Sequence, residues 1–169
     1  GNPNILQLLW LSDQYYGRRT AAGFLLLDNR GLFVGRHVYH SFVGYARGQL
    51  HRMTHGAFDG YMGEKRKGLV ERFGYDTKNA AHLIRLLRMG TEFLRDGKLY
   101  VERTSDASEL LEIKRGEWPL ERVKQEADHW FRLAEEAYLT SALPIEPDRA
   151  KISQLCVAVV ERALEDIGA

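Results

Sequence analysis

Apolar residues recur with helical spacing along most of the chain, so we expect a mainly α-helical fold. The clearest stretch is residues 78–96, where leucines and alanines return every three or four positions. Thr77 or Asp76 can cap its start, and Gly97 suits the position after its last turn. Further helices are expected over residues 36–55, 64–73, 119–142 and 149–167, the last capped by Asp148. The pattern predicts one compact helical domain over residues 1–169, with residues 148–167 as its terminal helix.

Four segments are less regular. "NPNILQLLWL" predicts an opening helix with Asn2 as its cap and Pro3 in its first turn. "TAAGFLLL" suits a helix or a strand, and we favour a helix. The glycine-rich "GAFDGYMGEKRKG" predicts a loop. "KLYVERT", residues 98–104, alternates as a strand does, so we allow at most one small strand or hairpin.

A further helix is expected after residues 98–104, in "SDASELLEIKRGEW". Ser105 suits the cap position of a capping box, and Gly116 suits the end of the helix. This assignment leaves residues 105–116 as a short helical connection to the long helix that follows.

The helix over residues 78–96 has apolar residues on two sides. Its core face holds Ala80, Leu83, Ile84, Leu87, Thr91 and Leu94, with Gly90 beside them. The opposite face holds Lys78, His82, Arg85, Met89 and Phe93, and Arg88 lies between the two faces. We therefore expect this helix to be covered on most sides, with Gly90 allowing a neighbour to approach closely.

Two interpretations of His82, Arg85 and Arg88 remain open. In the first, the arginines pair with carboxylates of the second half of the chain, and His82 is a partly buried, hydrogen-bonded histidine. In the second, the three side chains and Lys78 line a pocket for an anion such as a triphosphate, because the guanidinium fork binds phosphate through two hydrogen bonds. Spacing alone favours the first interpretation, since structural ion pairs also produce such clusters.

The stretch from residue 37 to residue 53 raises the same question. Arg47 and His51 lie on its polar face with His40 and Gly44. These side chains suit either a solvated surface or a contact with a ligand. We expect no metal site here, because no acidic residue joins the histidines at ligand spacing.

Charge is unevenly distributed although the net charge is only +1. Residues 1–103 carry 16 Lys and Arg against 9 Asp and Glu, whereas residues 104–169 carry 8 against 14. The basic part can dock on the acidic part, or it can attract a nucleotide or RNA. The single cysteine, Cys156, excludes an internal disulfide and fits the cytoplasm. No uncharged apolar run approaches the roughly 18 residues that a membrane span needs.

Four segments, in order, resemble the C-terminal part of a family of predicted nucleotidyltransferases. They are "GNPN", "SFVGYARGQLHRM", "KNAAHLIRLLRMGTEFLRDGKLYVER" and "ELLEIKRGEW". The family is the RNA-repair-pathway branch of the DNA polymerase β superfamily, and the resemblance spans about residues 1–140. It implies that the chain is the helical C-terminal part of an α/β nucleotidyltransferase. It also implies that this helix packs beside the nucleotide cleft, where His82, Arg85 and Arg88 are candidates to face a triphosphate or polynucleotide; it does not say which of the three does.

The same resemblance places the catalytic chemistry upstream of this chain. There a Gly-Ser turn and two carboxylates one residue apart on a strand would hold magnesium for transfer from a nucleoside triphosphate. This chain has no Gly-Ser dipeptide and no Asp-x-Asp. Glu126 and Asp128 are two apart, but a helix would splay them by about 200°.

These observations fix what we expect of the chain itself. We expect no catalytic residue and no cofactor in it, and no nucleotide transfer by it alone. Because it opens on Gly1, we expect a processed or truncated piece whose N-terminal catalytic domain is missing. Apolar surface left uncovered by that loss could drive self-association. The alternative is a non-catalytic module that binds nucleic acid or another partner.

Overall fold

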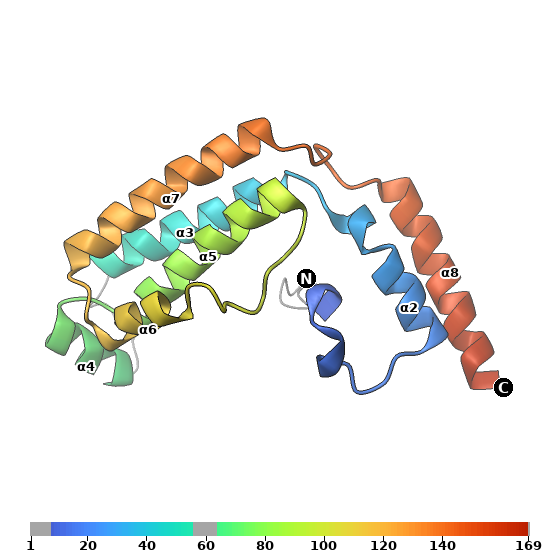
Figure 1. The fold of residues 1–169 in the computed structure, drawn as a ribbon, viewed down its shortest axis with the longest axis horizontal. Helices are drawn as coiled ribbons and strands as arrows, with labels where there is room; N and C mark the ends of the chain where they lie inside the picture. The colour runs from blue at the N-terminus through green and yellow to red at the C-terminus, as the bar shows by residue number, and fades with distance from the viewer. Residues whose placement is uncertain (1–7, 56–63, 169) are drawn as a thin grey trace.

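The structure is a computed structural model that describes residues 8–55 and 64–168. Within these residues it contains α-helices and 3-10 turns and no strand (Figure 1). The helices are α2 (Ala21–Asp28), α3 (Val38–His55), α4 (Glu64–Phe73), α5 (Thr77–Asp96), α6 (Ala107–Arg115), α7 (Leu120–Thr140) and α8 (Arg149–Gly168). The 3-10 turns are η1 (Leu8–Trp10), η2 (Asp13–Tyr15) and η3 (Arg30–Phe33). The predicted mainly helical fold is confirmed.

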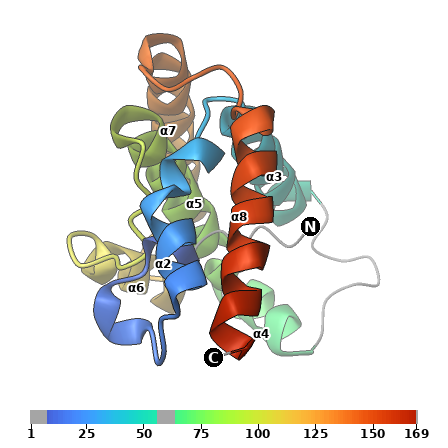
Figure 2. The same ribbon diagram turned by 90° about the vertical axis from the view of Figure 1, so that its right-hand side faces the viewer.

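The helices form two groups. In the first, which we call the body, α5 lies in the centre and contacts α3, α4, α6 and α7. In the second, which we call the arm, α2 lies beside α8 (Figure 2). The two groups meet where the segments after η3 and after α7 run together: the amide of Arg36 donates to the carbonyl of Pro144 (2.9 Å), and that of His37 to the carbonyl of Ile145 (3.2 Å).

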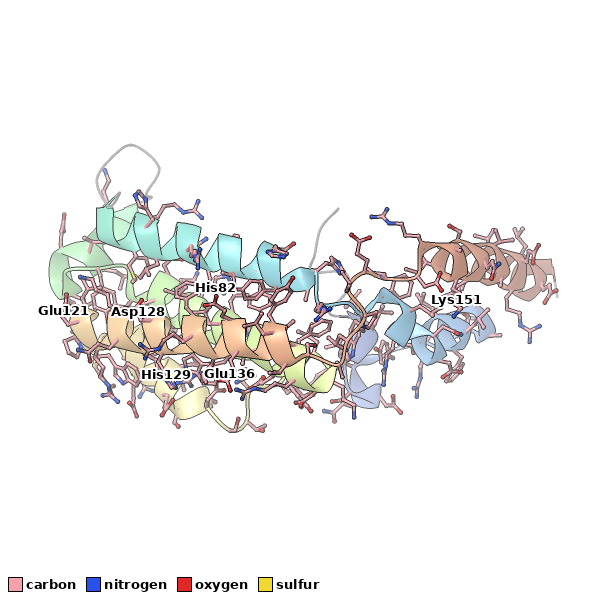
Figure 3. All side chains as sticks on the ribbon, turned by 90° about the horizontal axis from the view of Figure 1, so that it is seen from above. His82, Glu121, Asp128, His129, Glu136 and Lys151 are labelled. Carbon is pink, nitrogen blue, oxygen red and sulfur yellow. The ribbon has the colours of Figure 1, made fainter. Side chains whose placement is uncertain are left out.

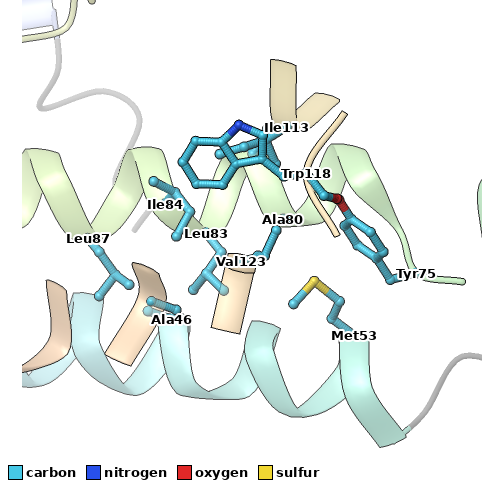
Figure 4. Packing of buried hydrophobic residues seen from close by; sticks show 12 residues of the cluster. Ala46, Met53, Tyr75, Ala80, Leu83, Ile84, Leu87, Ile113, Trp118 and Val123 are labelled. Carbon is cyan, nitrogen blue, oxygen red and sulfur yellow. The ribbon is translucent and has the colours of Figure 1, made fainter. Parts of the chain in front are cut away.

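The hydrophobic core lies in the body and is built on the predicted face of α5. Ala80, Leu83, Ile84 and Leu87 are fully buried there. They pack against side chains of α3, α6, α7 and the residues before α5 and α7, namely Ala46, Met53, Tyr75, Ile113, Trp118 and Val123 (Figure 4). Met89 and Phe93, on the other face of α5, are also buried. The expectation that this helix is covered on most sides is therefore confirmed for its C-terminal half.

Helix α5 begins and ends where the sequence predicts. The Asp76 carboxylate caps the start by accepting from the amide of Asn79 (3.0 Å), while Thr77 is the first helical residue. Gly97 follows the helix in the left-handed conformation, with φ of 67°. Gly90 lies against the ring of Phe42 in α3, and a Cβ at this position would overlap that ring. A glycine is thus required for α3 and α5 to pack at this distance.

The expected strand over residues 98–104 is wrong. Its alternation is real, because Leu99, Val101 and Arg103 are partly buried while the residues between them are exposed. No described segment pairs with it, however, so its backbone runs irregularly from α5 to α6 without a ladder of hydrogen bonds. The alternation of apolar and polar residues therefore reflects a segment with one side turned inward, not a strand of a sheet.

Two helix starts also differ from expectation. The residue before α6 is Asp106, not Ser105, and its carboxylate makes no capping bond, because Arg88 and Arg103 occupy it. The opening helix of "NPNILQLLWL" falls partly outside the described residues, and its described end, Leu8–Trp10, is a 3-10 turn.

Most of the expected glycine-rich loop, residues 56–63, lies outside the described residues, and α4 already begins at Glu64. The helix expected in "TAAGFLLL" is confirmed as α2, capped by the Thr20 hydroxyl.

None of the helices that the structure describes is both long and apolar enough to cross a membrane.

Candidate functional site

The structure divides the six candidate binding residues among three places. Lys78, His82 and Arg85 lie together on the face of α5 that points away from the core. Arg88, one turn further along, is buried. Arg47 and His51 lie on α3, on the side that faces α7. The structure therefore does not gather the six residues on one surface.

Arg88 is held by carboxylates and is only 6% exposed. Its guanidinium donates to Asp106 at 3.1 Å and to Glu126 at 2.7 Å, and it lies 2.7 Å from a carboxylate oxygen of Glu109. Trp130 flanks it, with the ring centroid 5.5 Å from the guanidinium carbon. For Arg88 the ion-pair interpretation describes the structure: all three carboxylates come from the acidic second half of the chain.

Arg103 extends this network, although sequence reasoning did not single it out. Its guanidinium donates to Asp106 at 2.9 and 2.6 Å and forms a two-pronged ion pair with Glu92. Asp106 thus accepts from two arginines, one on α5 and one on the irregular segment. The three-residue spacing of Arg103 and Asp106 was the only signal in the sequence that could have indicated this pair.

Arg85 has a different environment from Arg88, although the two are three residues apart. Among the described residues no carboxylate lies within ion-pair distance of it, and its Nε, like that of Arg88, is buried without a hydrogen-bond partner. Burying a polar N–H without a partner costs free energy, so most such groups in folded proteins are satisfied. Arg85 is therefore a partly buried cation with no carboxylate partner among the described residues.

His82 lies beside Arg85 and is exposed. Its ring meets Tyr45 of α3 edge to face, with the centroids 6.2 Å apart. Desolvation lowers the pKa of His82, and the charge of Arg85 lowers it further. The lowered pKa favours the neutral imidazole, which can both donate and accept a hydrogen bond.

Lys78 completes a strip along α5 with His82 and Arg85. It is exposed and lies one turn before His82. The strip ends where the same face of α5 becomes covered, because Phe93 packs edge to face on Trp10 at 6.3 Å. We call Lys78, His82 and Arg85 the basic strip.

Arg47 and His51 lie on the far side of α3 from the basic strip. The guanidinium of Arg47 sits 5.8 Å from the ring centroid of Phe131 in α7. Arg47 and Tyr45 are two residues apart in a helix, which separates their directions by about 200°. The surface of α7 also exposes acidic side chains, among them Glu121, Asp128 and Glu136 (Figure 3). Such a surface repels phosphate, so the basic strip is the better anion site.

No group of three or more histidine, cysteine or acidic side chains suited to a metal ion occurs among the described residues.

Comparisons with protein families, with curated proteins and with solved structures found no match to this chain.

Proposed function

We propose that this chain is a helical nucleotide- or polynucleotide-binding domain that works beside a catalytic nucleotidyltransferase domain. The observation that supports binding is the contrast between Arg85 and Arg88. The fold surrounds Arg88 with three carboxylates and leaves Arg85, three residues earlier, with none among the described residues. The sequence resemblance supports the second part of the proposal, the catalytic neighbour.

The basic strip suits a phosphate group chemically. The guanidinium of Arg85 can donate two parallel hydrogen bonds to phosphate oxygens and stays charged at any physiological pH. The neutral imidazole of His82 can bond a sugar hydroxyl or a base edge next to that phosphate. Lys78 adds an exposed charge that attracts the polyanion from a distance.

Magnesium and a nucleoside triphosphate enter this proposal only through the catalytic domain. We place that domain N-terminal to this chain and the whole protein in the cytoplasm. The second candidate function is a module that binds RNA or a protein partner without any catalytic neighbour.

Replacing Arg85 with alanine is expected to weaken binding of a single-stranded RNA oligonucleotide, and of ATP, by about tenfold or more. That is the usual effect of losing a hydrogen bond to a charged group. Titration of fluorescent probes at several salt concentrations measures it, and the slope of log Kd against log salt should also become shallower.

Arg132→Ala is the matched control, because Arg132 is exposed on α7 and its loss removes the same charge. Thermal melts of both variants should match the parent chain. A lower melting temperature for Arg85→Ala with unchanged binding would assign Arg85 a purely structural role and reject the proposed site.

The chain by itself is expected to transfer no nucleotide. The sequence lacks the Gly-Ser turn and the carboxylate pair that would hold the two metal ions. Incubation with magnesium, radiolabelled nucleoside triphosphates and an RNA acceptor should leave the acceptor unlabelled. Labelled product that grows with time and enzyme concentration would show that the chain contains a catalytic site of its own.

A further inference from the structure

The C-terminal helix α8 is poorly covered by the rest of the chain. It spans 20 residues, whereas α2, the helix beside it, spans eight. Among the side chains of α8 that the structure describes, only Leu155 is buried. Most of the stability of a helix in a protein comes from packing of its apolar face. A helix of this length with one buried side chain among those described is therefore expected to pack against something else.

The uncovered side of α8 is apolar. Val157 and Val160 are each 58% exposed, and Leu164 is 63% exposed. Ser153 and Cys156, one turn earlier, are exposed as well. In a helix these residues share one face, at spacings of three and four, and that face points about 140° or more away from Leu155 for the two valines and the leucine. We call Ser153, Cys156, Val157, Val160 and Leu164 the α8 stripe.

The stripe has the spacing that pairs one helix with another. Positions that repeat by three and four residues form the seam between two packed helices. Ser153 and Cys156 are small, which allows two helix backbones to approach closely over that part of the seam. The stripe therefore fits a second helix better than a flat surface.

The charges on α8 oppose the dipole of the helix itself. Arg149 lies in the first turn and Glu165 in the last, where each charge is unfavourable for an isolated helix. Lys151 is paired with Asp148 and Arg162 with Glu165 within the helix, at 3.4 and 2.9 Å. Arg149 and Glu161 have no ion-pair partner among the described residues. An antiparallel neighbouring helix with the same charge pattern would supply an ion-pair partner for each of these two residues.

A second α8 satisfies these conditions. If two copies run antiparallel with Val157 of one opposite Cys156 of the other, Arg149 lies opposite Leu164 and one turn from Glu161 of the second copy. A two-fold axis repeats each of these contacts twice, so one stripe is enough to complete the interface. α2 offers no such complement, since Asp28 is its only charged residue.

We propose that the α8 stripe is a self-association surface, on which α8 of a second copy of this chain packs antiparallel. This proposal stands apart from the basic strip, which lies on α5 in the body. Failure of either proposal leaves the other unaffected.

The first experiment measures the mass of the 169-residue chain in solution by light scattering and analytical ultracentrifugation over a range of concentrations. The parent chain should be a dimer, and Val160→Asp should weaken the dimer by at least about a hundredfold, because it buries two charges in the seam. Gln154→Asp is the control: Gln154 is exposed on α8 but lies off the stripe, so this variant should stay dimeric.

The second experiment crosslinks the chain through its own cysteine. Cys156 is the only cysteine and is exposed, so a bifunctional maleimide reagent should link two parent chains through it and should fail to do so in Val160→Asp. A monomeric parent chain would overturn the proposal, and the α8 stripe would then be expected to bind a different protein or domain. So would a dimer that Val160→Asp leaves intact.

The third experiment tests the direction of the pair. Arg149→Glu and Glu161→Arg should each weaken the dimer by about tenfold, and the double variant should restore it. Rescue is expected only if Arg149 of one copy lies within a turn of Glu161 of the other. In a parallel pair, or in a contact made elsewhere, the double variant would be no better than the single ones, which would overturn the antiparallel arrangement.

Discussion

Replacing Leu83 or Leu87 with alanine is expected to lower the free energy of unfolding by about 2–5 kcal/mol. Both side chains are fully buried in the centre of α5, where α3 and α7 pack on it. Truncation removes apolar contacts from the core and leaves a cavity that the surrounding helices fill only in part. Urea unfolding followed by circular dichroism measures the change.

Leu139→Ala is the matched control, because Leu139 is 71% exposed in the last turn of α7. Its loss should change the free energy of unfolding by less than about 0.5 kcal/mol. If the two core variants unfolded at the same urea concentration as this control, α5 would not be the centre of the fold.

The helices of the body could be predicted because their signals are local. In α5 the cap, the apolar face and the terminal glycine all lie within residues 76–97, and each was assigned from the sequence alone. The segment over residues 98–104 failed for the opposite reason. A strand needs a partner elsewhere in the chain, and alternation in one segment does not show whether a partner exists.

The candidate site shows the same limit. The sequence placed His82 and Arg85 together on one face of α5, and the structure agrees. It could not separate Arg85 from Arg88, because the three carboxylates that bind Arg88 lie between 18 and 38 residues away in the chain. Arg47 and His51 were candidates by charge alone, and only the packing of α3 on α7 separates them from the strip.

Replacing Arg88 with methionine is expected to lower the free energy of unfolding by about 3 kcal/mol. Removing one partner of a buried ion pair usually costs about 3–5 kcal/mol, because the other charge stays buried. The lower end applies here, since Asp106 keeps its bonds to Arg103, and Glu126 keeps the hydrogen bond from Trp130 at 2.7 Å. Methionine preserves much of the apolar stem, so the loss reports mainly on the charge.

Arg85→Met is the control for this experiment. It removes a cation from the same helix, three residues earlier, where no carboxylate is within reach among the described residues. Its free energy of unfolding should stay close to that of the parent chain, because no ion pair within the described residues is lost. Equal losses in the two variants would mean that the carboxylates around Arg88 contribute nothing specific.

The contribution of Arg88 should also depend on pH in a defined direction. Burial by itself would raise the pKa of Asp106, but hydrogen bonds from Arg103 and Arg88 outweigh it, and the pKa lies below the ordinary 3.8. Burial likewise opposes the shift at Glu126, where bonds from Arg88 and Trp130 bring the pKa below 4.5. The unfolded chain therefore binds these protons more readily than the folded protein does.

Stabilisation by the network is complete above about pH 5 and is lost as the pH falls through the lowered pKa values. Denaturant titrations between pH 2 and pH 7 should show the parent chain losing more stability in acid than Arg88→Met, so that the gap between the two narrows below about pH 4.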